Sequence, residues 1–174
     1  MRESWVRGIF FRQVLEYIKK NRGQTSYELL GRKIDNYIAE EKYEFDEFCE
    51  LLAKVKLISP NEDEYIAKIA RETMTEEATW KNLFRRMDPT TVFASTKRQD
   101  GRHLTADYEP TNITHGNVQL KMKMWTEKRE HQDLWADFYR GRLEGILELM
   151  GRTGTVRMVR EFGNSEFTYT IEWA

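Results

Sequence analysis

Asn117-Val-Gln-Leu-Lys-Met-Lys-Met-Trp125 is the stretch that decides the fold of this chain. Every second residue in it is apolar, at Val118, Leu120, Met122 and Met124. A period of two is typical of a strand with one buried face. A stretch with helical spacing follows from about Glu130 to Met150, and two more alternating runs close the chain, Thr155 to Phe162 and Glu166 to Trp173. We therefore predict the order strand, helix, strand, strand, with a turn at Gly163-Asn164 between the last two strands.

The first half of the chain is predicted to be helical. Ser4 is the expected cap of a first helix that stops at Gly23, and a second helix is expected after Thr25 or Ser26. In that second helix the residues expected to point inward are Leu29, Leu30, Ile34, Tyr37 and Ile38. A third helix is predicted over about Asp46 to Lys56.

Two further helices are predicted from their start signals. Ser59-Pro60-Asn61-Glu62 combines a capping serine with a proline at the first helical position. Thr75 is the expected cap of another helix, which Asp88-Pro89 is expected to stop. Beyond it we interpret Thr90 to Arg102 as a connector, His103 to Glu109 as a strand and Pro110 to Gly116 as a loop.

The predicted fold class is α+β, with a helical N-terminal half packed on an antiparallel β-sheet that carries one long C-terminal helix (β-β-α-β-β). Residues 1–174 fit a single domain, in which we distinguish a helical sub-region, 1–88, from a sheet-plus-helix sub-region, 103–174. The change from helical to two-residue periodicity near Asp88 marks the division.

Composition and charge exclude several classes of protein. A hydrophobic fraction of 40% with 13% aromatic residues argues against disorder. The formal net charge of −1 creates no overall field that attracts nucleic acid or an anionic membrane. The single cysteine, Cys49, excludes an internal disulfide and suits a reducing compartment. We expect a cytoplasmic protein without a membrane span and without nucleic acid as its partner.

Gly141 and Gly145 lie four residues apart on one side of the predicted C-terminal helix. A glycine inside a helix costs up to ~1 kcal/mol, so that close packing is a reason to keep it. The pair is therefore interpreted as a place of close backbone packing or, alternatively, as room for the approach of a flat ligand or a second chain.

A helical half followed by a sheet that one long helix interrupts resembles a superfamily of ligand-binding domains in NO signalling and Golgi transport. Its members include haem-nitric-oxide-binding (H-NOX) domains, 4-vinyl-reductase-type domains and subunits of the TRAPP tethering complex. The resemblance covers Asn117 to Trp173 and rests on hydrophobic patterns. It implies a sensory or ligand-binding domain, or an assembly protein.

The resemblance also brings a haem-binding motif that can be compared position by position. Haem-binding members carry Tyr-x-Ser-x-Arg after an alternating strand, and the matching positions here are Trp125, Glu127 and Arg129. A glutamate in place of the serine would put like charge beside a haem propionate. The family's haem-ligating histidine lies on an upstream helix, whereas no histidine precedes Asp88 in this chain. We therefore expect no haem and no other cofactor.

No set of residues with catalytic or metal-binding spacing is found. His103, His115 and His131 are not spaced as zinc ligands usually are, so we expect no metal site. Cys49 lies among apolar residues and is interpreted as a buried, inert thiol. The acidic residues of the long helix, Asp133, Asp137 and Glu144, are interpreted as part of a solvated, salt-bridged face. With no catalytic residue nominated, we expect that the protein is not an enzyme.

The leading functional hypothesis is a non-enzymatic small-molecule-binding or sensory domain, with an apolar pocket between the helical half and the sheet. Its expected lining residues are Trp125, Arg129, His131 and Trp135, and its expected ligand is a small hydrophobic or anionic molecule. Arg129 would hold an acidic group of that ligand. The same space filled by aromatic side chains is the alternative for this region.

The alternative function comes from the TRAPP resemblance: a homodimeric scaffold or assembly protein. On this hypothesis exposed aromatic residues of the N-terminal helix, such as Trp5 and Phe11, would anchor the dimer interface.

Overall fold

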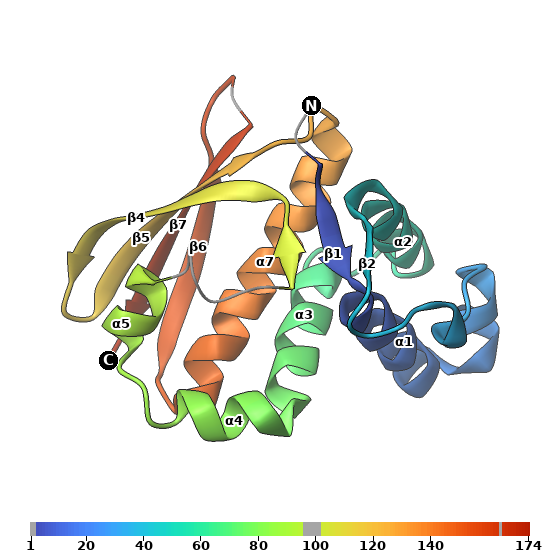
Figure 1. Cartoon of the computed structure of the whole chain (residues 1–174), viewed down its shortest axis with the longest axis horizontal. Helices are drawn as coiled ribbons and strands as arrows, with labels where there is room; N and C mark the ends of the chain where they lie inside the picture. The colour runs from blue at the N-terminus through green and yellow to red at the C-terminus, as the bar shows by residue number, and fades with distance from the viewer. Residues whose placement is uncertain (1–2, 96–101, 164) are drawn as a thin grey trace.

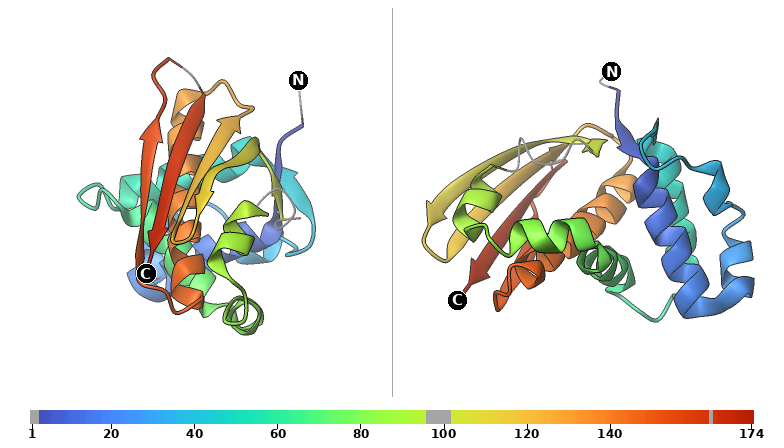
Figure 2. Two further views of the ribbon diagram at one scale, coloured as in Figure 1. Left: turned by 90° about the vertical axis from the view of Figure 1, so that its left-hand side faces the viewer. Right: turned by 60° about the horizontal axis from the view of Figure 1, so that its bottom comes forward.

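The computed structural model describes residues 3–95, 102–163 and 165–174 of the chain. The long helix α7 (Arg129–Leu149) runs through the middle of the molecule. A four-stranded sheet lies on one side of it, and α1 (Gly8–Leu29) and α2 (Phe45–Ile58) lie on the other (Figures 1 and 2). The α+β prediction is therefore confirmed.

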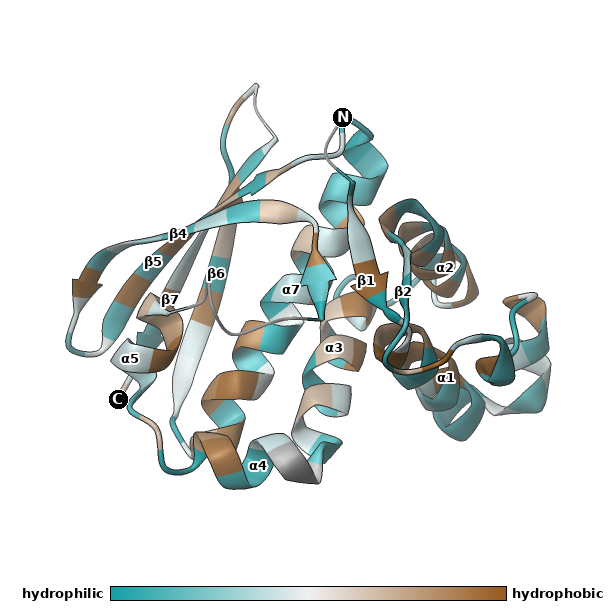
Figure 3. Cartoon of the chain, in the orientation of Figure 1, coloured by the Kyte–Doolittle hydropathy of each residue, from teal (hydrophilic) through white to brown (hydrophobic). Residues whose placement is uncertain are grey.

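The four-stranded sheet is antiparallel throughout, with the order β4-β5-β7-β6. Its strands are β4 (Ala106–Thr114), β5 (Asn117–Met124), β6 (Gly154–Arg160) and β7 (Glu166–Trp173). In the pairing of the two central strands, Leu120 lies opposite Tyr169 and Met122 opposite Phe167, and all four side chains are buried. The predicted alternation is thus confirmed in β5, and Figure 3 shows it as bands of contrasting hydropathy along the strands.

A second, smaller sheet ties the N-terminus to the second half of the chain. It has the order β2-β1-β3, with the strands β1 (Trp5–Arg7), β2 (Lys42–Glu44) and β3 (His103–Leu104). The expected cap at Ser4 is wrong, because residues 5–7 form β1 and the first helix begins only at Gly8. Their pairing with two other strands outweighs the local start signal.

The predicted second helix is also wrong in most of its length. Gly23, with φ at 84° and ψ at 176°, ends the first helical segment of α1 as predicted, and a short second segment follows this kink and ends at Leu29. Gly31, with φ at 65°, turns the chain away, and only the short 3₁₀ turn η1 (Ile34–Asn36) follows. Consequently Ile38, which we expected to point inward, is 56% exposed.

The third predicted helix is confirmed as α2, whereas the later helix signals lie in other places than expected. Ser59 does not cap a helix, because α3 (Tyr65–Glu76) begins six residues later, and Thr75 lies inside α3 rather than before α4 (Ala78–Phe84). Asp88 begins a helix instead of stopping one: its Oδ2 accepts a hydrogen bond from the Thr91 N–H at 3.0 Å. That helix, α5 (Pro89–Ala94), occupies part of the predicted connector.

The edge strand of the large sheet is also longer than predicted. Pro110 to Gly116 is not a loop, since β4 continues to Thr114 and pairs Pro110 with Leu120 of β5. Pro110 is tolerated there because β4 is an edge strand, where one row of N–H groups needs no partner. In the part of the chain that the structure describes, no helix combines the length and the apolar character needed to cross a membrane.

Candidate functional site

Trp125 follows the last residue of β5 and is half-buried. Its indole Nε1 donates a hydrogen bond of 3.0 Å to Asp107 Oδ2 on the neighbouring strand β4. The register of β4 and β5 places the two residues at the same end of the sheet, since Asp107 lies opposite Lys123. This end of the sheet therefore presents a fixed aromatic ring next to the start of α7.

Trp125 lines an open groove of about 680 Å³, which we call the sheet-end groove. The residues around it come from the end of β5, the start of α7 and the β6–β7 turn: Met124, Trp125, Thr126, Glu127, Arg129, Gln132, Arg160, Phe162, Gly163 and Ser165. Phe162 is fully exposed at the rim. The groove thus combines the apolar side chains of Met124, Trp125 and Phe162 with two arginines and the carboxylate of Glu127.

The two arginines of the sheet-end groove differ in their partners. Arg160 contacts Asp133 Oδ1 at 2.7 Å and Gln132 Oε1 at 3.0 Å, so its charge is neutralised within the chain. Arg129 is exposed, and its side chain makes no ion pair or hydrogen bond with the residues that the structure describes. It is the first residue of α7, whose start has no side-chain cap. A free guanidinium beside uncapped helix N–H groups favours an anion.

His131 is buried and lies at the contact between α7 and α2. Its Nδ1 is 2.9 Å from Asp46 Oδ1, and Lys128 Nζ donates to the other carboxylate oxygen at 2.6 Å. Partial burial of Asp46 acts to raise its pKa, but the hydrogen bonds from Lys128 and His131 outweigh it and hold the pKa below its usual value. The backbone carbonyl of His131 accepts from Cys49 Sγ at 3.7 Å. His131 therefore joins two helices and does not line the sheet-end groove.

Trp135 lies one turn further along α7 and is completely buried. Its Nε1 donates to the Tyr108 hydroxyl at 3.2 Å. Rings surround it, with Phe45 at 5.4 Å edge-on and Phe138 at 5.7 Å. Of the four residues that we predicted to share a pocket, Trp125 and Arg129 thus share the sheet-end groove, while His131 and Trp135 lie elsewhere.

The space between the helical half and the sheet is occupied by a buried aromatic cluster. Its members come from α1, α2, β3, α7 and β7: Phe10, Phe48, His103, Trp135, Phe138, Tyr139 and Tyr169. Neighbouring rings in it are 5.0–6.2 Å apart, mostly in tilted or edge-on arrangements. The described residues thus place aromatic side chains in the space that we expected to hold a ligand.

Gly141 and Gly145 face α3. A Cβ atom on Gly141 would come within 2.0 Å of the Ala67 carbonyl oxygen, and one on Gly145 within 2.9 Å of Met74 Cβ. The missing side chains therefore allow the backbones of α3 and α7 to touch, which is the close packing named above.

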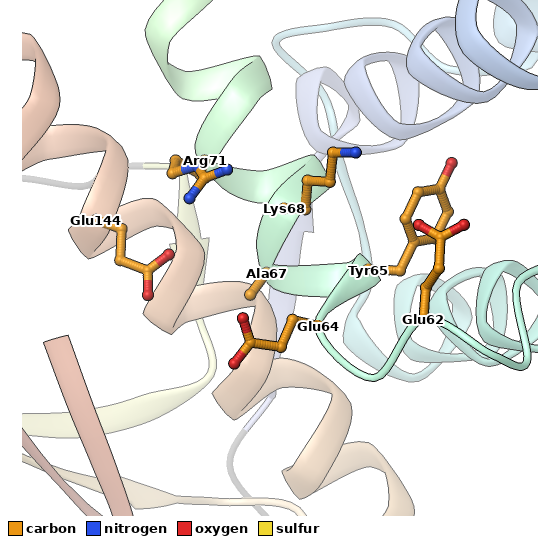
Figure 4. Close-up of a pocket in the computed structure, with 7 residues that line it drawn as sticks. All are labelled: Glu62, Glu64, Tyr65, Ala67, Lys68, Arg71 and Glu144. Carbon is orange, nitrogen blue, oxygen red and sulfur yellow. The ribbon is translucent and has the colours of Figure 1, made fainter. Parts of the chain in front are cut away.

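The acidic residues of α7 lie beside this contact. Figure 4 shows Glu144 extending from α7 toward a shallow pocket of about 280 Å³, with Lys68 and Arg71 on α3. Arg140 binds Glu144 at 3.2 Å and lies 3.8 Å from Asp137. Burial raises the pKa of both Asp137 and Glu144, although Arg140 opposes the shift. The predicted salt-bridged face is present, but it is partly buried rather than solvated.

Sequence reasoning missed a second hollow, of about 690 Å³, which we call the junction groove. Its walls come from β1, β2, the start of α2 and the β5–α7 loop: Glu3, Ser4, Trp5, Lys42, Tyr43, Glu44, Phe45, Asp46, Trp125, Thr126, Glu127 and Lys128. Residues 3–5 and residues 125–128, which are far apart in the sequence, thus line one hollow. The sequence did not indicate that residues 5–7 form a strand, and Trp5 of this strand lines the groove.

The sequence predicted no metal site and an inert thiol at Cys49. Within 3–95, 102–163 and 165–174, no three His, Cys, Asp or Glu side chains are placed so that they could hold a metal ion. Burial raises the pKa of the Cys49 thiol well above its usual value, so that the thiolate is disfavoured.

Comparison with known proteins shows similarity of structure without similarity of sequence. The chain matches no family model and no curated protein. It superimposes on the Fe(II) unliganded H-NOX protein from K. algicida with a TM-score of 0.71 and 14% identity, covering 97% of this chain and 96% of the other. An H-NOX protein from S. oneidensis in the Fe(II)NO state gives 0.70 and 12%, covering 97% and 99%. The chain therefore has the H-NOX fold.

The described residues do not fit the haem that the fold family implies. His131 is engaged with Asp46, and His115 lies exposed in the β4–β5 turn. His103 is buried, but four aromatic rings lie within 6.2 Å of its ring, so side chains of this chain enclose it. A haem needs an axial ligand that faces a flat apolar slot. Here the aromatic cluster takes that place.

Proposed function

We propose that this chain is a non-enzymatic ligand-binding or sensory domain that works without haem and binds a small amphipathic anion in the sheet-end groove. The observation that carries the proposal is Arg129, an exposed guanidinium without an ion pair among the described residues, at the mouth of a groove of about 680 Å³. Arginine binds a carboxylate or phosphate in two-point fashion. Trp125 and Phe162 offer flat apolar surface to the rest of the molecule.

A sensory role is supported by what lies next to the groove. Arg129 begins α7, and two residues later His131 contacts Asp46 of α2. An anion that binds Arg129 and displaces the first turn of α7 would change this contact between the two helices. The binding event would therefore reach the helical half of the molecule through one defined polar contact.

The test uses an amphipathic anion and its neutral counterpart. Octanoate is expected to bind the full chain and to perturb the Trp125 indole resonance, whereas octanol binds more weakly. Arg129→Ala should weaken octanoate binding by about tenfold, the factor expected for a charge-assisted hydrogen bond. Arg152→Ala is the matched control, because Arg152 is also exposed and has no ion pair among the described residues. Equal affinity in the wild type and Arg129→Ala would refute the site.

The absence of haem is tested separately. Protein produced in cells supplied with a haem precursor is expected to show no Soret band, and added haemin should not raise its melting temperature. A stoichiometric Soret band would overturn the non-haem part of the proposal. Native mass spectrometry of the freshly purified chain would reveal a retained ligand and, in the same spectrum, the homodimer expected from the alternative hypothesis.

A further inference from the structure

The junction groove carries chemistry opposite to that of the sheet-end groove. Two indoles, Trp5 and Trp125, line it. Its walls come from β1, β2, the start of α2 and the loop before α7, so the groove exists only in the folded chain. Indole faces from two separate segments along one hollow attract cations.

The charges around the junction groove are predominantly negative. Its lining includes four carboxylates, of Glu3, Glu44, Asp46 and Glu127, but only two ammonium groups. Asp46 forms an ion pair with Lys128, and His131 Nδ1 lies 2.9 Å from its other carboxylate oxygen. The carboxylates of Glu3, Glu44 and Glu127 form no ion pair with residues in the described ranges. Among the described residues that line the groove, carboxylates therefore outnumber ammonium groups four to two.

Lys42, the other ammonium group of the junction groove, shows that a cation fits against the Trp5 ring. Lys42 Nζ lies 4.3 Å from the centre of the Trp5 ring, and the Arg7 guanidinium lies 5.7 Å from it. Both distances are within the range of a cation–π contact. Trp5 thus already receives cations from its own chain, and the carboxylates beside it have none.

We propose that the junction groove binds a small organic ammonium ion, primary or quaternary, with its charge against Trp5 and Trp125 and near the carboxylates of Glu3 and Glu44. The two grooves share the loop from Trp125 to Glu127 and differ in all their other lining residues. An anionic ligand is disfavoured here by the same carboxylates.

The experiment compares choline with 3,3-dimethyl-1-butanol, which has the same shape without the charge. The five tryptophans give five indole N–H resonances in a ¹H–¹⁵N spectrum of the full chain. Choline is expected to shift those of Trp5 and Trp125 and to leave that of the buried Trp135 in place. The neutral alcohol should bind at least about fivefold more weakly. Equal binding of the two probes, or no shift with choline, would overturn the proposal.

Variants separate a cation site from a merely apolar one. Glu3→Gln/Glu44→Gln should weaken choline binding about fivefold, because it removes two carboxylates without removing packing. Glu109→Gln/Glu148→Gln makes the same change in net charge outside the groove and should leave the affinity unchanged. Lys42→Met removes the internal cation from Trp5 and is expected to tighten binding. If both double variants weaken choline equally, only the overall charge acts and the site is refuted.

Two variants distinguish failure of the cation site in the junction groove from failure of the anion site in the sheet-end groove. Arg129→Ala should leave choline binding unchanged while it weakens octanoate, and Glu3→Gln/Glu44→Gln should leave octanoate binding at least as tight.

Discussion

Gly141 on α7 lies directly against Ala67 on α3, so closely that a methyl group on the glycine would come within 2.0 Å of the Ala67 carbonyl oxygen. Backbone atoms form this contact, and they cannot rotate away as the end of a side chain does. The two helices therefore have one fixed separation at this point.

Gly141→Ala is expected to destabilise the fold by about 2–3 kcal/mol, because the overpacking cost exceeds the gain of up to ~1 kcal/mol in helix propensity. Gly145→Ala should cost less, since the nearest atoms there are partly those of the flexible Met74 side chain. Urea unfolding of both variants measures the difference. A neutral or stabilising Gly141→Ala would show that α3 and α7 can separate.

Tyr108→Phe tests the polar contact inside the aromatic cluster. The variant removes the acceptor for the Trp135 Nε1–H, which is buried and then loses its hydrogen bond. An unsatisfied buried donor costs about 1–3 kcal/mol. The double variant Tyr108→Phe/Trp135→Phe should cost less than the sum of the costs of the two single variants, and a double-mutant cycle by urea unfolding measures this coupling. Strict additivity would contradict the contact.

Asp46→Asn tests the contact between α2 and α7 through pH. The pKa of Asp46 is held below its usual value of 3.8, so its ionised form stabilises the fold above that value, and this contribution is lost as the pH falls through the lowered pKa. The wild type should therefore lose melting temperature below about pH 4 more steeply than the variant. Asp35→Asn, at an exposed aspartate of the 3₁₀ turn, is the control and should follow the wild type. Parallel curves for Asp46→Asn and the wild type would contradict the role of this carboxylate.

Asp137→Asn is expected to act in the opposite direction. Burial raises the pKa of Asp137, so its ionised form is disfavoured in the folded chain at neutral pH. Arg140 keeps Glu144 as a partner when Asp137 is neutral. The variant should raise the melting temperature at pH 7 by roughly 1–2 °C, as expected for a partly exposed charge, and the gain should shrink as the pH falls and the wild-type carboxyl takes up its proton. A gain that does not depend on pH would point to another cause.

The sequence predicted the elements whose signal is repeated over many residues. β5, β7 and α7 combine a clear period with a buried face, and each lies within a residue or two of its predicted bounds. Single-residue signals failed where tertiary pairing competed with them: Ser4 resembles a cap, but the next three residues pair as β1. An Asp-Pro pair can occur both at the start and at the end of a helix, so the local sequence does not distinguish the two. In the structure Asp88-Pro89 starts a helix.

The candidate site was predicted in part for a similar reason. Trp125 and Arg129 are close in sequence and lie on one loop and helix start, so proximity along the chain sufficed. His131 and Trp135 point to other surroundings, because residues two and six positions further along a helix face different directions. Phe11 was expected to be exposed, but it stacks on Tyr37 with ring centres 4.2 Å apart, and this partner could not be foreseen from the helix pattern.

The backbone contact at Gly141 has a mechanical consequence for α7. Over its 21 residues this helix is a rod about 30 Å long. Its first turn lies at the sheet-end groove, and its last residues pack with Phe84 of α4. The backbone contact at Gly141 fixes α7 against α3 near the middle of the helix. The helix therefore resists bending at this point and would move as one rigid unit. A small displacement of its first turn would then move the opposite end of the helix, because the helix would rotate as a rigid body about the contact at Gly141.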